Sequence, residues 1–363
     1  MLENTLSERE MDIYNRLCDE ESQLVFNVRK HFALTKDKTH FADIFVNRKQ
    51  LAEVAQKLNG KTYVLYGGGF SGGTLERHFD ILGFSDNCKG VWDNNQFLHG
   101  KIWCKQSITA PNYELLGKID IFLITALNTQ AVASITQDLT SRGVALDSIM
   151  AVEPFGRTIG RCGFEEVMQY FDKEIIVPRL SKNEVFIDAG CCNFGTSHHL
   201  LELNPNVKSI YAFEPDHENM KFVSHVVQYN KVQHIVKLYD FALWSSNEEL
   251  EFWVSDFNKG ASSVNSINSN TKISGRKLDD IVLPEDTVTF IKMDIEGAEL
   301  EALKGSAEII KRDKPKLAIS IYHKKMDYVD IAEYICSLVP EYKLYMRHYT
   351  PIKHETVLYC VRE

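Results

Sequence analysis

The sequence lacks the features that mark secreted, membrane-spanning and fibrous proteins. The N-terminal run MLENTLSERE has neither a basic nor an apolar segment, so we expect no cleaved secretory signal. The longest apolar run, IDIFLITAL, is broken by Asp120 and is too short to span a bilayer. Glycine (20) and proline (9) are not enriched among the 363 residues, which argues against collagen-like and low-complexity chains.

Paired cysteines and a basic charge surplus are also missing. The eight cysteines show no CxxC or Cys/His ligand spacing, so we expect free thiols in a reducing cytoplasm rather than a disulfide framework. The formal net charge is −9, from 41 basic and 50 acidic residues. We therefore expect no nucleic-acid partner and no anionic membrane partner.

What is present indicates a two-domain α/β protein. The length favours two domains, and 44% hydrophobic with 25% charged residues is typical of globular proteins. Residues 1–60 have helical periodicity, with a capping-box pattern at Ser7 and Glu10. Strands and helices alternate over 61–152, which predicts a small Rossmann-like domain with a parallel sheet. A connector over 153–182 leads to a second alternating series, 183–363, whose last two strands should pair antiparallel.

The first domain carries a glycine loop with dinucleotide-binding spacing. In YVLYGGGFSGGTLERHF, Gly67, Gly69 and Gly72 follow a strand and open a helix, and Asp93 follows the next strand. One interpretation is a nicotinamide-dependent enzyme, but the YxxxK pattern at Tyr349 lies in a proline-containing turn rather than a helix. The loop could instead bind a nucleotide or nucleotide-sugar, or its glycines could serve packing alone.

The second domain carries another glycine loop, which contains an acidic residue. VFIDAGCCNFGTSHHL places Asp188 and Gly190 between a strand and a helix, and YAFEPD places Glu214 at the end of the next strand. A carboxylate inside the loop disfavours a pyrophosphate and suits a ligand with an amino group and a sulfonium. Glu214 can accept hydrogen bonds from ribose hydroxyls. Both features fit S-adenosylmethionine better than NAD.

The second half resembles the FkbM family of S-adenosylmethionine-dependent O-methyltransferases. The resemblance covers roughly residues 165–363, and IKMDIEGAELEALKG followed by the strand end SIYH is its most specific part. It implies a class I methyltransferase sheet with an antiparallel C-terminal hairpin, and methyl transfer to a hydroxyl of a sugar, nucleotide-sugar or glycan precursor. The chain departs from the family in the first loop, where Phe194 replaces the second glycine and Gly195 follows it.

Strand ends supply the candidate site residues. The candidate catalytic residues lie at the ends of the fourth and fifth strands: Asp294, Glu296 and His323. Asp327 is the expected orienting partner of His323, and Glu299 is expected to cap the following helix. The candidate cofactor-binding residues are Asp188, Gly190, Asn193, Glu214, Asp240 and Asp294.

Other interpretations stay open. A divalent cation at Asp294 and Glu296 is one alternative, but the sequence shows no further clear ligand, so no metal site is predicted. A methyltransferase fold that binds partners without catalysis is another. The polar loop 259–266 could contact substrate or be an ordinary surface loop. An acidic chain that ends in an edge hairpin could also form a homodimer.

Overall fold

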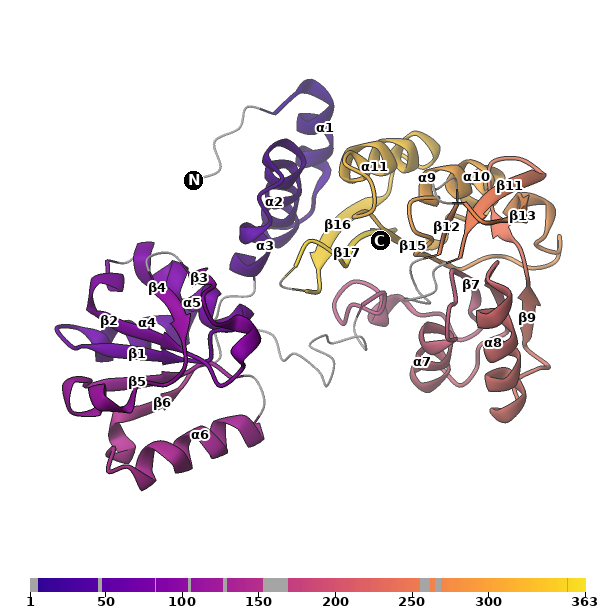
Figure 1. Cartoon of the computed structure of the whole chain (residues 1–363). Coiled ribbons are helices and arrows are strands. Elements are labelled where there is room, and N and C mark those ends of the chain that lie inside the picture. The colour runs from indigo at the N-terminus through magenta and orange to yellow at the C-terminus, as the bar shows by residue number, and fades with distance from the viewer. Residues whose placement is uncertain are drawn as a thin grey trace. The chain divides into compact units, whose positions relative to one another are not determined.

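The chain folds into two compact units, each described here by itself (Figure 1). The computed structural model describes residues 6–44, 48–81, 83–103, 106–126, 129–152, 169–254, 262–264, 269–350 and 352–363. The smaller unit comprises residues 39–159, and the larger unit combines residues 1–38 with 160–363.

The smaller unit is a Rossmann-like α/β layer. Its described residues form a six-stranded sheet in the order β3-β4-β2-β1-β5-β6, parallel except for the β3–β4 pair. The strands are β1 (Tyr63–Tyr66), β2 (Cys88–Trp92), β3 (Ile102–Trp103), β4 (Gln106–Thr109), β5 (Ile121–Ile124) and β6 (Ile149–Ala151). The helices are α3 (Thr39–Ile44), α4 (Arg48–Leu58), α5 (Phe70–Ile81) and α6 (Thr129–Ser141), with 3-10 turns at Ser85–Asn87, Gln96–Leu98, Tyr113–Lys118 and Leu146–Ser148.

Helices cover both faces of this smaller sheet. Tyr63 and Leu65 of β1 pack with side chains of α4 and α5, whereas Val64 and Tyr66 pack with side chains of α6. Successive side chains of a strand point to opposite faces, so a continuous apolar run is required when both faces are covered. The predicted parallel α/β layer is confirmed, and the short β3–β4 pair is an addition that the sequence did not indicate.

The larger unit contains a class I methyltransferase sheet. Its seven-stranded sheet has the order β16-β17-β15-β14-β7-β8-β9 among the described residues. Strand β17 runs antiparallel between β15 and β16, and the other neighbouring pairs are parallel. The strands are β7 (Val185–Ala189), β8 (Ser209–Phe213), β9 (Val236–Tyr239), β14 (Phe290–Met293), β15 (Lys316–Ser320), β16 (Lys343–His348) and β17 (Thr356–Val361). The expected C-terminal hairpin is thereby confirmed.

Helices lie on both sides of the seven-stranded sheet (Figure 1). α7 (Gly195–Leu203) and α8 (His217–Tyr229) pack against one face through Leu200, Val223 and Val227, together with Phe186 and Phe290 of the sheet. α9 (Glu299–Lys304), α10 (Ala307–Asp313) and α11 (Asp327–Leu338) lie on the other side. Short 3-10 turns occur at Val177–Arg179 and Leu278–Asp280.

A small second sheet was not predicted. Its order is β10-β13-β11-β12, formed by β10 (Ala242–Leu243), β11 (Glu248–Trp253), β12 (Ser263–Val264) and β13 (Thr271–Arg276). Most side chains of β11 and β13 are exposed or half-buried, so the strands lack the apolar signal of core strands. The substrate-loop expectation for 259–266 falls mostly outside the described residues.

The N-terminal helices divide between the units. α1 (Glu8–Arg16) begins with the predicted capping box, in which the Ser7 N–H donates to Glu10 at 2.8 Å. α2 (Glu20–Thr35) contacts β16 of the larger unit, where Arg347 binds Asp19 at 2.7 Å. The segment expected as one helical region over 1–60 is thus split, because α1 and α2 have buried polar partners in the larger unit while α3 and α4 belong to the smaller one. Of the expected connector, 153–168 lies outside the described residues.

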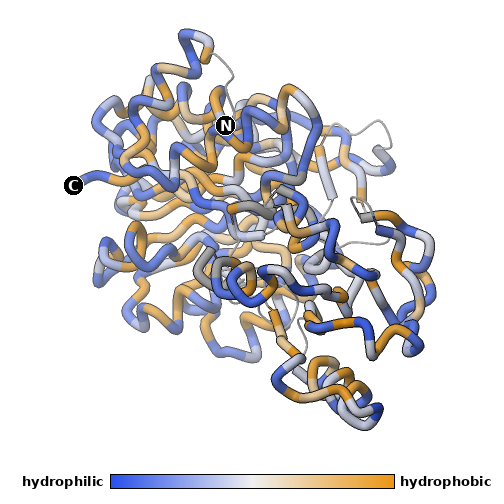
Figure 2. The backbone as a smooth tube through the Cα atoms, turned by 90° about the vertical axis from the view of Figure 1, so that its left-hand side faces the viewer, coloured by the Kyte–Doolittle hydropathy of each residue, from blue (hydrophilic) through white to orange (hydrophobic). Residues whose placement is uncertain are grey.

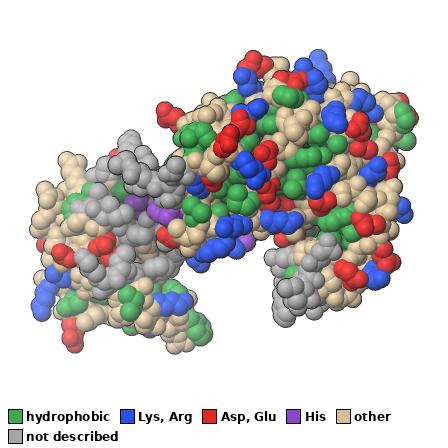
Figure 3. All heavy atoms as spheres, turned by 90° about the horizontal axis from the view of Figure 1, so that it is seen from above, with side chains coloured by type: hydrophobic (Ala, Val, Ile, Leu, Met, Phe, Trp, Pro, Cys, Tyr) green, Lys and Arg blue, Asp and Glu red, His purple; other side chains and the backbone are tan. Residues whose placement is uncertain are grey.

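Hydrophobic and charged residues are distributed as is usual for a globular protein. Figure 2 shows hydrophobic residues concentrated along the extended segments of the chain, and Figure 3 shows acidic and basic side chains intermixed on the visible face. Within the described part of the chain, no helix is both long enough and apolar enough to cross a membrane.

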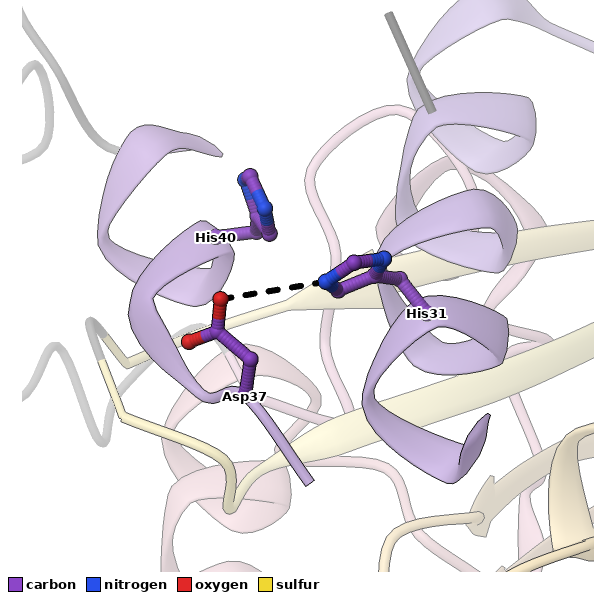
Figure 4. Close-up of side chains that lie close together, drawn as sticks. All are labelled: His31, Asp37 and His40. Carbon is purple, nitrogen blue, oxygen red and sulfur yellow. Dashed lines mark ion pairs between the residues drawn. The ribbon is translucent and has the colours of Figure 1, made fainter. Parts of the chain in front are cut away.

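One ion pair of the larger unit lies close in sequence to residue 39, where the smaller unit begins. At the end of α2, His31 Nε2 lies 3.8 Å from Asp37 Oδ2 (Figure 4). His40, also drawn there, belongs to the smaller unit, so we assign no site to these three residues.

Candidate functional site

The main cavity of the larger unit opens at the carboxyl ends of its central strands. It comprises about 580 Å³ of space, part of which is open to solvent. Strands β14, β7 and β8 are neighbours, so the residues that follow them meet at one edge. The lining residues are Ala189, Gly190, Cys192, Phe213, Glu214, Pro215, Phe241, Ala242, Leu243, Phe252, Ser262, Val264, Asp294, Ile295, Glu296 and Ala298.

Gly190 is required by the close approach of two loops. Its φ is +77°, and a Cβ at this position would lie 2.0 Å from the carbonyl oxygen of Asp294. Only glycine adopts this conformation readily and leaves room for that carbonyl. The glycine therefore holds the β7 loop against the β14 loop at the floor of the cavity.

Asp188 is buried in an ion pair beneath the glycine loop. Its Oδ1 lies 3.1 Å from Lys292 Nζ, and its Oδ2 accepts a hydrogen bond of 2.6 Å from Ser197. Lys292 also donates to the carbonyl oxygens of Ala189 and Gly190, at 3.1 and 2.7 Å. Asp188 is fully buried and is not among the residues that line the cavity. In this structure its charge anchors Lys292, which in turn fixes the loop.

Glu214 follows β8 and lines the cavity. Its Oε2 accepts a 3.0 Å hydrogen bond from the Cys192 N–H, and its Oε1 accepts one of 2.9 Å from the Asp216 N–H. Burial raises the pKa of Glu214 to about 7, although the two N–H donors oppose this. A carboxylate oxygen has more than one lone pair, so Glu214 retains acceptor capacity toward a ligand.

The turn after Gly190 is reshaped around Phe194. Phe194 has a left-handed backbone (φ +68°) and a buried side chain in the core beside α7. This is the position where the family usually has glycine, and glycine would adopt this conformation without strain. Asn193 is exposed and accepts a 2.8 Å hydrogen bond from the Gly195 N–H.

Asp294 lies at the end of β14 and is held by two tyrosines. Tyr170 Oη donates to Oδ2 at 2.7 Å, and Tyr322 Oη donates to Oδ1 at 3.0 Å. Burial favours the neutral acid, but the charges of His323 and Lys292 and the hydroxyl donors lower the pKa of Asp294 below its ordinary value. The carboxylate is therefore ionised near neutral pH.

Asp294 also lines a second, more polar hollow of about 950 Å³. Its lining residues are Gln169, Tyr170, Phe171, Asn193, Gly195, Thr196, His198, His199, Glu202, Asp294 and Glu355. Asn193, expected to bind the cofactor, lies in this hollow rather than in the main cavity. Burial and the nearby charge of Asp294 raise the pKa of Glu355 to about 7.

His323 follows β15 and faces three carboxylates. Its Nδ1 lies 2.9 Å from Glu299 Oε1, and its Nε2 lies 3.6 Å from Asp294 Oδ1 and 3.5 Å from Glu296 Oε2. Burial alone would lower the pKa of His323, but these carboxylates raise it to about 11. Glu296 has a left-handed backbone (φ +53°), which is uncommon for a residue with a side chain.

The residue that orients His323 differs from the expected one. Glu299 contacts Nδ1 and also accepts the N–H groups of Ile295 and Gly297, at 2.9 and 3.4 Å. It therefore stabilises the loop before α9, rather than capping the helix as expected, and it also holds the imidazole. Asp327, expected in the orienting role, instead accepts a 2.6 Å hydrogen bond from the Lys324 N–H.

Asp240 is exposed just beyond the end of β9 and is not among the residues that line either cavity. Its proposed contact with a cofactor stays a prediction. Its neighbour Phe241 does line the main cavity, with Leu243 and Phe252, and these side chains form an apolar wall.

The glycine loop of the smaller unit forms a hydrogen bond with the side chain of Asp93. Asp93 Oδ2 accepts a 2.7 Å hydrogen bond from the Gly68 N–H, and Oδ1 accepts one of 2.7 Å from Asn95. A Cβ on Gly72 would lie 2.0 Å from the carbonyl oxygen of Gly67. The loop's packing thus accounts for Gly72, and Asp93 bonds to the loop backbone itself.

Part of the larger unit matches a known family. A sequence profile of the methyltransferase FkbM domain matches residues 188–344. Residues 188–344 form an FkbM methyltransferase domain. Gly190, Glu214, Asp294 and His323 all lie within it. No curated protein sequence matches the chain.

Several solved structures are similar to this chain. Methyltransferase FkbM from Methylobacillus flagellatus KT shows 20% identity and a TM-score of 0.49, over 94% of this chain and 99% of that one. An rRNA methylase from Streptococcus thermophilus shows 16% identity and a TM-score of 0.35, over 52% and 90%. Fibrillarin from Aeropyrum pernix, in complex with S-adenosyl-L-methionine, shows 12% identity and a TM-score of 0.32, over 52% and 70%. The strand order described above, rather than these likenesses, establishes the class I sheet.

Proposed function

We propose that the FkbM domain is an S-adenosylmethionine-dependent O-methyltransferase that acts on a hydroxyl of a sugar, nucleotide-sugar or glycan precursor. The observation that carries the proposal is the position of Gly190, Glu214 and Asp294 after three neighbouring strands, around one cavity of about 580 Å³. Open α/β sheets bind their ligands at this edge.

The charges and shape of the cavity fit this cofactor. Asp188 and Lys292 cancel each other, while Asp294, Glu296 and Glu299 outnumber the single positive charge of His323. A negative surplus favours a ligand with a sulfonium and an ammonium group. Glu214 would accept from the ribose hydroxyls, and Phe241 and Phe252 offer an apolar wall for the adenine. When bound, S-adenosylmethionine supplies an electrophilic methyl group.

The protein's own contribution is alignment of the acceptor and disposal of its proton. Asp294 is ionised and lines both cavities, so it can accept a hydrogen bond from an acceptor hydroxyl. Tyr170 and Tyr322 fix its orientation. His323 carries a proton in the resting site, so it can serve as a base only after that proton leaves; a cation bound beside it favours this loss.

The polar second hollow supports a polyhydroxylated acceptor. Hydrogen-bonding groups line this hollow, from Gln169, Asn193, Thr196 and Glu202.

The test of the proposed function is transfer of a radiolabelled methyl group from S-adenosylmethionine to a panel of nucleotide-sugars by the full chain. We expect label in at least one sugar product, and its loss in Asp294→Asn. Label only on amines or carbon atoms would contradict O-methylation.

A further inference from the structure

His323 is the centre of a cluster that the proposed function does not fully explain. The side chain is only 9% exposed, and among the described residues neither ring nitrogen makes a hydrogen bond of ordinary geometry, although both lie near carboxylates. Buried polar groups are ordinarily satisfied by a hydrogen-bond partner, an ion or an ordered water. Carboxylate oxygens of Asp294, Glu296 and Glu299 lie 2.9–3.6 Å from the ring nitrogens.

The two sides of the imidazole differ. Glu299 is 1% exposed, is held by the N–H groups of Ile295 and Gly297, and contacts Nδ1 at 2.9 Å. This leaves Nε2 directed toward Asp294 and Glu296. Metal-binding histidines typically have a carboxylate at one ring nitrogen and further metal ligands near the other nitrogen, and His323 has this arrangement.

The separations suit a bound cation. Imidazole nitrogens and carboxylate oxygens lie about 2.0–2.2 Å from a divalent ion, so adjacent ligands around it are about 3.0–3.5 Å apart. Asp294 Oδ1 and Glu296 Oε2 lie 3.6 and 3.5 Å from Nε2, close to the separation of adjacent ligands. Asp294, Glu299 and His323 place one ligand atom each within 4.8 Å of one another, whereas Glu296 is not part of this group and would have to turn toward Asp294 to share an ion with it.

We propose that His323 Nε2, Asp294 and Glu296 bind one divalent first-row transition ion such as Mn²⁺, with Glu299 as a positioning residue. One imidazole with two carboxylates suits this class of ion better than Ca²⁺, which prefers oxygen ligands alone. Asp294 and Glu296 line the main cavity, so the ion lies at its edge. There it would lower the pKa of an acceptor hydroxyl, a consequence that rests on the proposed function.

The test is a titration of the metal-stripped full chain with Mn²⁺, followed by the loss of the six-line electron paramagnetic resonance signal of the free ion. We expect one ion per chain. His323→Gln and Glu296→Gln should each weaken binding by at least about ten-fold, and Glu299→Gln by about 10–100-fold. The matched control is Glu308→Gln, an exposed acid paired with Lys311, which should leave binding unchanged.

The result that overturns the site is no stoichiometric binding, or the same affinity in His323→Gln and Glu296→Gln. Circular dichroism confirms that each variant is folded; if His323→Gln is not, Glu296→Gln decides. A parallel titration with S-adenosylhomocysteine in the absence of Mn²⁺ separates the two proposals. Binding of S-adenosylhomocysteine without binding of Mn²⁺ overturns the cation site alone, and the reverse outcome overturns the cofactor assignment alone.

Discussion

At the scale of single residues, Glu214 shows how a carboxylate serves the fold and a ligand together. It joins the β7 loop to the β8 loop through the N–H groups of Cys192 and Asp216. Burial raises its pKa to about 7, above the ordinary value of a glutamate. By itself, the raised pKa makes the folded state lose stability as pH rises from about 4.5 to 7, because the unfolded chain releases the proton first.

Cofactor binding should have the opposite pH dependence. Ribose hydroxyls donate to the ionised Glu214, so binding favours proton loss, and affinity should rise as pH increases through about 7. If only the ionised form binds, we expect affinity for S-adenosylhomocysteine to be about ten-fold higher at pH 8 than at pH 6. Calorimetric titration at both pH values checks this. Glu214→Gln should bind weakly with little pH dependence; an unchanged slope would remove Glu214 from the site.

Other site residues differ in how far sequence could predict them. Asp294, Glu296 and His323 were placed from strand-end position and family resemblance, and the structure brings them together. Nothing in the sequence indicated that Tyr170 contacts Asp294, because 124 positions separate the two residues. The sequence did contain an indication for Lys292, because it is a charged residue inside the apolar run FIKM.

The buried ion pair of Asp188 makes this residue a poor choice for a mutational test of cofactor binding. We expect Asp188→Ala to leave Lys292 as an uncompensated buried charge, which typically costs about 3–5 kcal/mol. Weak cofactor binding by that variant would therefore not distinguish a lost contact from a damaged fold. Glu214 is the better probe.

At the scale of elements, strand order and the hairpin could be predicted, whereas the partners of the N-terminal helices could not. Apolar runs with intervening helices defined the parallel strands, and closeness in sequence defined the β16–β17 pair. The docking of α2 on β16 depends on Arg347, which forms ion pairs with three acidic residues. Asp19 and Glu21 lie more than 300 positions from Arg347 in the sequence, and Asp172 lies 175 positions from it. Helical periodicity contains no information about such a partner.

Arg347 should therefore contribute strongly to stability. Its side chain is 6% exposed and binds Asp19 at 2.7 and 3.1 Å and Ser22 at 3.0 Å. We expect Arg347→Met to lower the free energy of unfolding by about 2–4 kcal/mol, because half-buried acids lose their counter-charge. Urea unfolding checks this.

Arg9→Met is the matched control. Arg9 also joins the N-terminal segment to the larger unit, through Asp330 and Glu333, but its side chain is 52% exposed. Exposed ion pairs contribute about 0–1 kcal/mol, so its loss should have little effect. Equal losses in both variants would contradict the assigned role of Arg347.

At the scale of the whole molecule, two glycine loops with similar sequence patterns have different surroundings. The loop at Gly190 borders a cavity with acidic residues at neighbouring strand ends. The loop at Gly72 packs on itself, and Asp93 accepts an N–H of that loop. Spacing could not separate the two, because glycines that permit close packing and glycines that admit a ligand form the same pattern.

The most direct test of the central claim is isothermal titration of the full chain with S-adenosylhomocysteine, with NADH as a parallel titrant. We predict saturable binding of S-adenosylhomocysteine with one site per chain, weakened in Glu214→Gln, and no binding of NADH. Binding of NADH with none of S-adenosylhomocysteine would contradict the account and make the loop at Gly67 the functional site.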